Sequence, residues 1–411
     1  MTMSARGNNL DHVRRHNLAT VLRLVHHDRG SARSQLTRAT GLNRSTIAAL
    51  VAELVELGLV AETEPESTKQ VGRPSPVVAP RPDVAVLALN PEVDAVELAL
   101  VGLGGEILRR ERHLQREVPS VDSVVALVAG RLAEWSAAEV PAGGGATVAG
   151  IGVAVPGLVR ASDGLVRHAP HLGWRDAPLA AELAAATSLP AYSANDASLG
   201  ALAERLFGAG RGIGELVYMN GGASGIGGGI MAGDRLLGGL DGYAGEFGHL
   251  RVGGSDHVDT AGLSGTLESE VRRSRLLELG ELGTVDDAEL ERRVRADGGG
   301  LSAEIERQAG YLGVAIGGIV NVLNPELVLL GGFLGILLDA APDTVRAALA
   351  ATSLDAPLAS VRLERPALGR DILMIGAAEL AFEPVLADPA GFERGRGPAV
   401  ARSASGFGRL A

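Results

Sequence analysis

Four consecutive polar residues, Asn43 to Thr46, carry side chains suited to hydrogen bonding with the edges of DNA bases. They stand at the start of a helical pattern, where a recognition helix meets the major groove. An Arg guanidinium at such a place donates two hydrogen bonds to one guanine. With nearby polar residues they form the predicted DNA-binding set: Arg33, Ser34, Asn43, Arg44, Ser45, Thr46 and Arg73.

A helix-turn-helix over residues 31–60 would position these groups. Leu36 and Ala39 supply the apolar face of a short first helix, Gly41 allows the turn, and Leu42 fills the angle between the helices. Asn43 can cap the second helix. A helix over 17–27 is expected to pack beneath this motif. The residues of the second helix that face inward by their spacing are Ile47, Leu50, Val51, Leu54 and Leu57.

The alternative is a buried helical hairpin with no role on DNA. The exposed positions favour DNA reading, because they hold Arg, Asn, Ser and Thr rather than Glu or Lys chosen for solubility.

A wing and an extended arm are predicted to follow. Residues 58–61 turn into a short strand, and the polar segment 64–70 forms a hairpin that returns through Val71. In Gly72-Arg73-Pro74 the outer residues favour an extended arm, and Arg73 suits a narrow A·T-rich minor groove. A plain linker with a solvated arginine is the alternative. The predicted division is a winged helix-turn-helix DNA-binding domain over 1–72 and a linker over 73–82.

Charge is distributed unevenly along the chain. Residues 1–82 contain 11 Lys and Arg against 7 Asp and Glu, a net charge of +4, and the remainder has 27 against 42, a net charge of −15. A basic head on an acidic body suits a DNA-reading module joined to a small-molecule-binding one. There is no cysteine, which excludes disulfides and thiolate metal sites. Without a long apolar run or a secretory signal, we expect a cytoplasmic protein with no membrane contact.

From residue 83 the pattern changes to alternating strands and helices. Residues 84–90 and 95–111 are predicted as two antiparallel strands joined near 90–94, residues 121–139 as a helix and residues 148–159 as a buried strand. Glycine is concentrated at strand ends, where backbone approaches a ligand or another chain closely. The alternation predicts a two-lobed α/β body over 83–390, with a cleft between the lobes and a flexible tail over 391–411.

Several segments of this body resemble the ROK family of repressors and sugar kinases. They are residues 193–197, the glycine-rich stretch 207–230, residues 242–249, and residues 324–326 running into Gly331-Gly332. The resemblance implies an actin- and hexokinase-like body. With the winged head, the chain is similar to the repressor branch, which includes xylose and N-acetylglucosamine repressors. That branch implies a double-stranded DNA operator, a sugar or sugar phosphate effector, and a homodimer or homotetramer.

The resemblance also implies a sugar site. Carboxylates accept hydrogen bonds from hydroxyl groups, and an amide both donates and accepts them, so such a set suits a polyhydroxy ligand. Segments on both sides of the cleft are expected to contribute. The residues that match the family's motifs are Asn195, Asp196, Glu246, His249 and Glu268.

The phosphate loop of the family's kinases is not recognisable here. The kinases carry Asp-x-Gly-Gly-Thr where this chain has residues 90–94, Asn-Pro-Glu-Val-Asp. No glycine remains to let backbone N–H groups reach phosphate, and Glu92 and Asp94 would repel a triphosphate. We therefore expect a binding protein with no catalytic residue, no enzyme activity and no cofactor.

Two further departures concern the loop after His249 and the sugar site itself. Many family members hold a structural zinc with one His and three Cys, and the cysteine positions fall near Asp259, Ala261 and Thr266. Zinc prefers thiolate or imidazole ligands, so no metal is expected and the loop should be held by packing alone. An improvised zinc site made of His249, Asp259 and the side chains at 256 and 257 is the alternative. The family commonly has Asn at the position of His171, which leaves the ligand open.

Two other functions stay open on the sequence. The first is an ATP-dependent sugar kinase with an accessory DNA-binding head. The second is a regulator of the same family that no longer binds a sugar.

Overall fold

The computed structural model describes residues 10–63, 75–136, 146–222, 225–283, 285–296 and 299–392. They divide into two compact units. Unit 1 contains the described residues up to Ala154, then 177–193 and those from 377 onward, and unit 2 contains 155–176 and 194–376. The predicted wing hairpin 64–70, the arm with Arg73 and the tail from 393 lie outside the described residues. Among the described helices, none has the length and apolarity needed to cross a membrane.

The N-terminal part of unit 1 is a head made of a helix-turn-helix and a small sheet. Gly41 ends the first helix of the motif in the left-handed conformation (φ +69°), which glycine adopts without strain. The third strand pairs antiparallel with the other two. The elements are α1 (Leu10–His27), β1 (Ser31–Ala32), α2 (Arg33–Thr40), α3 (Arg44–Glu56), β2 (Val60–Thr63) and β3 (Val77–Pro80).

Three details of the head differ from the prediction. Ala39 is exposed, because Leu36 alone turns inward on the two-turn helix α2. Leu57 is half-buried at the end of α3, whereas the other four predicted residues are buried. Residues 77–80 of the predicted linker form β3, because their backbone completes the ladder with β2.

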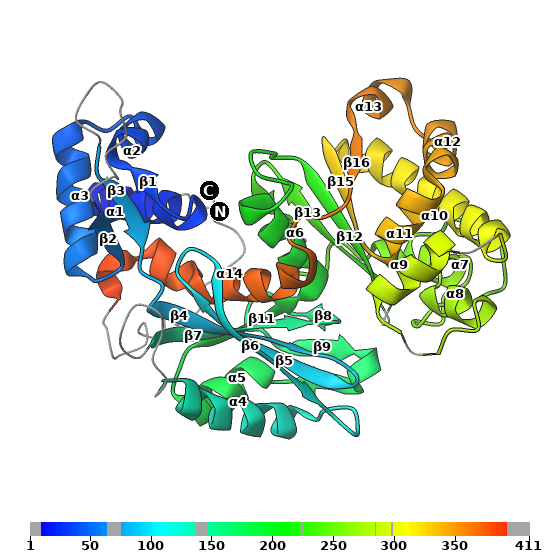
Figure 1. Cartoon of the computed structure of the whole chain (residues 1–411), viewed down its shortest axis with the longest axis horizontal. Coiled ribbons are helices and arrows are strands. Elements are labelled where there is room, and N and C mark those ends of the chain that lie inside the picture. Colours follow the sequence, from blue (N-terminus) through cyan, green and yellow to red (C-terminus); the bar gives the residue numbers. More distant parts are fainter. Residues whose placement is uncertain are drawn as a thin grey trace. The chain divides into compact units, whose positions relative to one another are not determined.

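The rest of unit 1 is a five-stranded sheet in the order β11-β7-β4-β5-β6. Helices α4 and α5 lie side by side on one face, and α14 runs along the other (Figure 1). Gly152 allows α14 to lie directly on β7, since a Cβ there would collide with the Ala377 carbonyl. The elements are β4 (Val84–Pro91), β5 (Ala95–Gly102), β6 (Glu106–Leu114), α4 (Val121–Ser136), β7 (Thr147–Val155), α5 (Leu179–Thr187), β11 (Ala191–Asn195) and α14 (Ile372–Ala387).

The single strand predicted over 95–111 is wrong. A turn at residues 103–105 splits it into β5 and β6, and both Gly104 and Gly105 have positive φ there. The two halves then pair with each other as a hairpin.

Unit 2 has a second five-stranded sheet, in the order β14-β13-β12-β15-β16, and a small sheet of β8, β9 and β10. Successive side chains of β12 and β15 point to opposite faces and enter two separate apolar clusters. The strands are β8 (Leu158–Val159), β9 (Val166–Ala169), β10 (Trp174–Ala177), β12 (Leu216–Gly222), β13 (Gly225–Ala232), β14 (Arg235–Leu236), β15 (Leu327–Gly332) and β16 (Arg362–Glu364).

The helices of unit 2 cover both faces of this sheet, with α6 on one and α10 and α11 on the other (Figure 1). They are α6 (Asp196–Phe207), α7 (Leu267–Glu270), α8 (Arg273–Leu279), α9 (Asp287–Ala296), α10 (Ser302–Leu323), α11 (Phe333–Ala340), α12 (Pro342–Thr352) and α13 (Asp355–Ser360). The 3₁₀ turns are η1 (Pro170–Leu172), η2 (Phe247–His249), η3 (Gly369–Asp371) and η4 (Pro389–Gly391).

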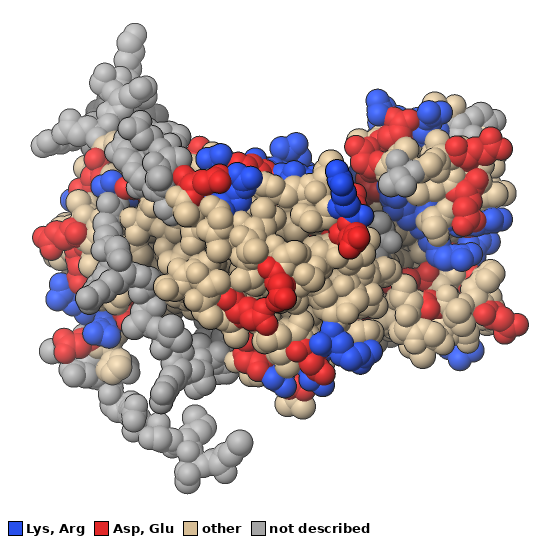
Figure 2. Space-filling view, turned by 90° about the horizontal axis from the view of Figure 1, so that it is seen from below, with Lys and Arg blue, Asp and Glu red and all other residues tan. Residues whose placement is uncertain are grey.

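Surface charge differs between the two units on the side of α4 and α5. Uncharged residues dominate the surface of unit 1 there, whereas Arg, Asp and Glu are interspersed over α8 and α9 of unit 2 (Figure 2). On α9 these charges pair within the helix, as Glu289 does with Arg293 and Glu291 with Arg295. Such exposed pairs contribute little to stability, and their mixed signs produce no extended basic patch in this view.

Candidate ligand pocket and DNA-reading surface

A cavity of about 300 Å³ in unit 2 brings together the five predicted sugar-site residues. This volume lies at the small end of the range for ligand sites, about 300–1,000 Å³. Every residue that lines it belongs to unit 2, so the prediction that both lobes contribute is wrong for this pocket. The five residues are Asn195, Asp196, Glu246, His249 and Glu268.

Glycines of β13 allow the walls of the pocket to approach each other. A Cβ at Gly229 would lie 2.6 Å from the carbonyl oxygen of Ala197, at the start of α6. A Cβ at Gly228 would collide with Phe247, in η2. The glycine-rich sequence of β13 therefore brings Asp196 from α6 and His249 from η2 to the same pocket.

The carboxyl groups of Asp196 and Glu246 both resist ionisation. Burial raises the pKa of Asp196 to about 7, with a further contribution from the negative charge of Glu246. Burial also raises the pKa of Glu246; His249 opposes this shift and Glu268 adds to it. Two neighbouring carboxyl groups with raised pKa values are suited to exchanging hydrogen bonds with hydroxyl groups, because each accepts when ionised and can also donate when protonated.

Asn195 and Glu268 mainly hold the pocket walls in place. The Asn195 side chain caps α6 by accepting from the Ser198 N–H at 2.9 Å and donates to the Gly157 carbonyl at 3.1 Å. The Glu268 carboxylate accepts from the Ile226 N–H at 3.0 Å and from the Thr260 hydroxyl at 2.5 Å. Each therefore has only part of its hydrogen-bonding capacity left for a ligand.

His171 lines the same pocket from η1. Its Nε2 atom is buried and has no hydrogen-bond partner among the described residues. A ligand that fills the pocket can supply that partner, so His171 joins Asp196, Glu246 and His249 as a candidate contact.

The loop after His249 is held by hydrogen bonds around one carboxylate. His249 Nδ1 lies 2.8 Å from Asp259 Oδ2, and the Thr266 hydroxyl donates to the same oxygen at 2.8 Å. The residues at the family's zinc positions therefore bond to one another and present no set of zinc ligands. Asp256 and His257 belong to no metal-sized cluster in the described part of the chain. The prediction that packing alone holds the loop is wrong.

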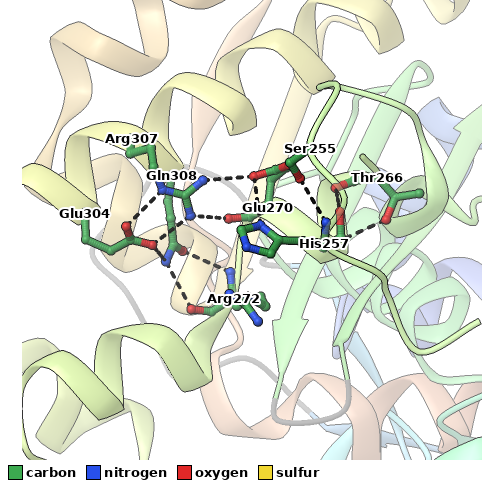
Figure 3. A network of polar contacts seen from close by, with 9 residues as sticks. Ser255, His257, Thr266, Glu270, Arg272, Glu304, Arg307 and Gln308 are labelled. Carbon is green, nitrogen blue, oxygen red and sulfur yellow. Dashed lines mark hydrogen bonds and ion pairs between the residues drawn. The ribbon is translucent and has the colours of Figure 1, made fainter. Parts of the chain in front are cut away.

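A second buried carboxylate, Glu270, anchors the same loop to α10. Arg307 donates from Nη1 to its carboxylate at 3.0 Å and from Nη2 to its carbonyl at 2.7 Å. Ser255, in the loop, donates to the other carboxylate oxygen. Figure 3 shows these side chains converging on Glu270, with Glu304 and Gln308 of α10 extending the network.

In unit 1, the position of the kinase phosphate loop is a tight hairpin between β4 and β5. The Glu92 N–H donates to the Ala95 carbonyl at 2.7 Å, and Asn90 pairs with Glu97 in the ladder. Arg112 bonds to the Glu92 carboxylate and lies 3.0 Å from that of Asp94. The hairpin thus presents paired carboxylates and ladder-bonded backbone in place of a phosphate cradle.

The start of α3 presents the predicted DNA-reading residues. The Asn43 Oδ1 atom accepts from the Thr46 N–H at 2.8 Å and from the Ser45 hydroxyl at 2.7 Å, which confirms the predicted cap. Arg44 and Ser34 are exposed. Arg33 forms a bidentate pair with Glu62 of β2, at 2.5 Å for both bonds, so it would have to exchange this partner for DNA.

An anchor between α1 and α14 was not predicted. The buried His26 accepts from the Gly104 N–H at Nδ1 (2.8 Å), and its Nε2 lies 2.6 Å from a Glu379 carboxylate oxygen. His27 contacts the other oxygen at 3.2 Å. The sequence held one signal of it: His26 follows Leu22 by four residues and so continues the apolar face of α1.

This group of two imidazoles and one carboxylate is close enough to hold a metal ion. Its hydrogen bonds oppose one. Because Gly104 donates to Nδ1 of His26, the proton of the neutral ring is on Nε2 and points to Glu379, so His26 has no lone pair free for a cation. Burial lowers the pKa of His26 although Glu379 opposes the shift. Burial also disfavours the ionised Glu379, but the adjacent histidines hold its pKa below the usual range.

Known proteins resemble both the body alone and the body with its head. The model of the ROK family matches residues 87–383. A xylose repressor of Caldicellulosiruptor bescii is 25% identical over 91% of this chain and 97% of its own length. A glucokinase of Streptomyces coelicolor is 29% identical, over 53% of this chain and 74% of its own length. A solved ROK family transcriptional regulator, a homologue of the E. coli MLC protein, has a TM-score of 0.72 and 25% identity and covers 92% of this chain and 98% of its own.

Proposed function

Because the chain belongs to the ROK family, we propose that it is a cytoplasmic transcriptional repressor of carbohydrate metabolism whose body senses a sugar or sugar phosphate. The observation that carries this proposal is the extent of the matches. A xylose repressor and a transcriptional regulator align with more than nine-tenths of the chain, head and body together. The glucokinase aligns with about half of it.

In this proposal the head binds an operator in double-stranded DNA, and α3 lies in the major groove. One short recognition helix reads few bases, so a homodimer or homotetramer would read paired half-sites. The exposed Arg44 is the proposed reader of guanine. The full proposed contact set is Arg33, Ser34, Asn43, Arg44, Ser45, Thr46 and Arg73.

We further propose that the body has lost kinase activity. The β4–β5 hairpin supports this, because the Glu92 and Asp94 carboxylates stand where a kinase needs backbone donors for phosphate. A coupled assay for ADP release, run with a panel of sugars and a ROK glucokinase as the positive control, tests it. Sugar-dependent ADP release by this protein would establish the kinase alternative.

The proposed ligand contacts are Asp196, Glu246 and His249, with Asn195 and Glu268 supporting them. Two of these residues lie next to a point where the chain passes from one unit to the other, here called a crossing. Asn195 and Asp196 directly follow the crossing after Ser193, and the Asn195 amide bonds to Gly157, which follows the crossing after Ala154. A ligand held there would bias the conformation of both crossings.

At a third point the chain passes from one unit to the other, and this point links ligand binding to the head. It lies within α14, after Gly376, and Glu379 and Glu383 follow it on the next turns. Glu379 bonds to His26, and Glu383 forms a bidentate pair with Arg23 at 2.8 and 2.9 Å. In our proposal α14 transmits the ligand's preference for one conformation to α1. The expected coupling is about 1–3 kcal/mol, roughly a 5–150-fold change in operator affinity.

The decisive experiment measures operator affinity with and without sugar by fluorescence anisotropy, on duplexes selected from a random pool. A sugar panel first identifies the effector by thermal shift, because a ligand that binds only the folded state raises the melting temperature. Asp196→Asn should bind operator like the wild type but lose the response to the effector. Asp256→Asn, an exposed residue of the loop after His249, is the matched control and should keep the response. A full response in Asp196→Asn would overturn the assignment of the pocket.

A further inference from the structure

The carboxylate of Asp259 lies at the centre of four hydrogen-bond donors. Its Oδ2 atom faces His249 Nδ1 and the Thr266 hydroxyl, each at 2.8 Å. Its Oδ1 atom accepts from the N–H groups of Ala261 and Leu263, each at 2.9 Å. No surface of this side chain is exposed. Burial disfavours its charge, but the hydrogen bond from His249 and the other donors lower its pKa, so the group is an anion.

The charge at the centre of this loop is opposite to the charge that a bound metal ion would place there. A cation is surrounded by atoms that give lone pairs, whereas Asp259 is an anion surrounded by hydrogen atoms. Whether a metal ion or Asp259 contacts His249 decides which ring nitrogen carries the proton. A metal on Nδ1 would leave the ring proton on Nε2, but an ionised carboxylate accepts only, so the proton must be on Nδ1 and the neutral ring offers a lone pair at Nε2.

Nε2 of His249 lies 4.0 Å from Glu246 Oε2, on the side of the pocket. At that distance the two atoms form no hydrogen bond with each other, so a ligand hydroxyl group can donate to Nε2. Asp196 adds further acceptor oxygens to the same cavity. No Lys or Arg is among the described residues that line it, which hold the three carboxyl groups of Asp196, Glu246 and Glu268.

We propose that Asp259 is a positioning residue that replaces a metal ion and fixes His249 as a hydrogen-bond acceptor. The pocket then selects an uncharged sugar through its hydroxyl donors and rejects a sugar phosphate. The rejection follows from charge: the described residues that line the pocket include no cation to neutralise a phosphate, and any carboxyl group that ionises there would repel it. This inference rests on the proposed sugar-sensing function and narrows its ligand class.

Two measurements on the full-length protein test the positioning role without any ligand. Nitrogen-15 NMR of the histidine rings at pH 8 should find His249 with its proton on Nδ1, and Asp259→Asn should lose this preference. Asp256→Asn is the control and should keep it. Elemental analysis of the purified protein should find less than one zinc per chain, and a chelator should leave its melting temperature unchanged. A proton on Nε2 in the wild type, or one zinc per chain, would overturn the proposal.

Ligand selection is tested by calorimetry with matched pairs, glucose against glucose 6-phosphate and N-acetylglucosamine against its 6-phosphate, with xylose as a further uncharged sugar. An uncharged sugar should bind, and its phosphorylated partner should bind more weakly. Asp259→Asn should weaken that binding about 3–10-fold, the net value of one hydrogen bond, while its operator affinity stays unchanged. Equal or tighter binding of a sugar phosphate would overturn the selection rule.

The experiments distinguish a failure of the sugar-sensing function from a failure of the role assigned to Asp259. If no sugar of either kind binds and NMR still finds the proton on Nδ1, the sensing function is wrong and the role of Asp259 stands. If a sugar binds and Asp259→Asn changes neither the ring proton nor the affinity, the sensing function stands and the role of Asp259 is wrong.

Discussion

Two imidazole–carboxylate pairs in this protein have opposite ring polarities. In unit 1, His26 is fully buried and both of its nitrogens bond to the protein, to Gly104 and to Glu379. In unit 2, Asp259 occupies only Nδ1 of His249, and Nε2 faces Glu246, another residue that lines the pocket. The number of ring nitrogens that bond to the protein therefore separates a structural histidine from one that can contact a ligand.

The largest expected effect is on the pair in unit 1. His26→Ala removes the partner of a buried carboxylate and of the Gly104 N–H, so it should lower the free energy of unfolding by about 3–5 kcal/mol. Urea denaturation measures this loss. Thr20→Ala, a change at a half-buried position of the same helix, is the control for the loss of side-chain volume. A loss below about 1 kcal/mol would mean that this pair does not anchor the head.

Asp196→Asn should have the next largest effect, and its sign depends on pH. The folded pKa of about 7 lies above the unfolded value of 3.8, so wild-type Asp196 favours the folded state at low pH, and this contribution is lost as pH rises from about 4 to 7. The variant cannot titrate. Relative to wild type it should gain nothing below pH 4 and roughly 2–4 kcal/mol above pH 7. Denaturation at pH 4 and pH 8 gives both values, and an equal difference at the two would contradict the shifted pKa.

Arg44→Ala tests whether the reading surface is independent of the pocket. It should weaken operator binding by about 1–3 kcal/mol if the guanidinium reads a guanine. The thermal shift produced by the effector should not change. An equal loss of affinity for operator and for random DNA would identify a phosphate contact.

The smallest expected effect on stability is at the histidine that faces the pocket. In His249→Ala the Asp259 carboxylate keeps three of its four donors, so the free energy of unfolding should fall by only about 1 kcal/mol. Sugar affinity should fall by about 10-fold, measured by calorimetry. A small loss of stability in His249→Ala and a large one in His26→Ala would show that only His26 has a structural role. If His249→Ala were as unstable as His26→Ala, the two pairs would have the same structural role.

Local patterns in the sequence were sufficient for several parts of the structure. The cap at Asn43 and four of the five predicted inward residues of α3 follow from helical spacing and from the chemistry of one side chain, so these were predicted correctly. The motifs also named five residues that gather in one pocket. Ligand binding at that pocket stays a prediction.

Long-range partners were not predictable in the same way. His26 and Glu379 are 353 positions apart, and no local pattern connects them. At Asp259 the sequence indicated the loss of a metal ligand. It did not indicate that the carboxylate holds the same loop in place by accepting hydrogen bonds. The strand β3 was missed because its pairing depends on β1 and β2 rather than on its own residues.

The attachment of α1 to α14 sets an order on the synthesis of the protein. The head leaves the ribosome first, but Glu379 is translated 353 residues after His26. At about 5–20 residues per second the head is exposed for roughly 20–70 seconds before its anchor exists. During that time His26 and Arg23 of α1 lack Glu379 and Glu383, their partners on α14. The head of a nascent chain therefore depends on its own contacts, chiefly those of α1 with α3 and β3, until α14 is complete.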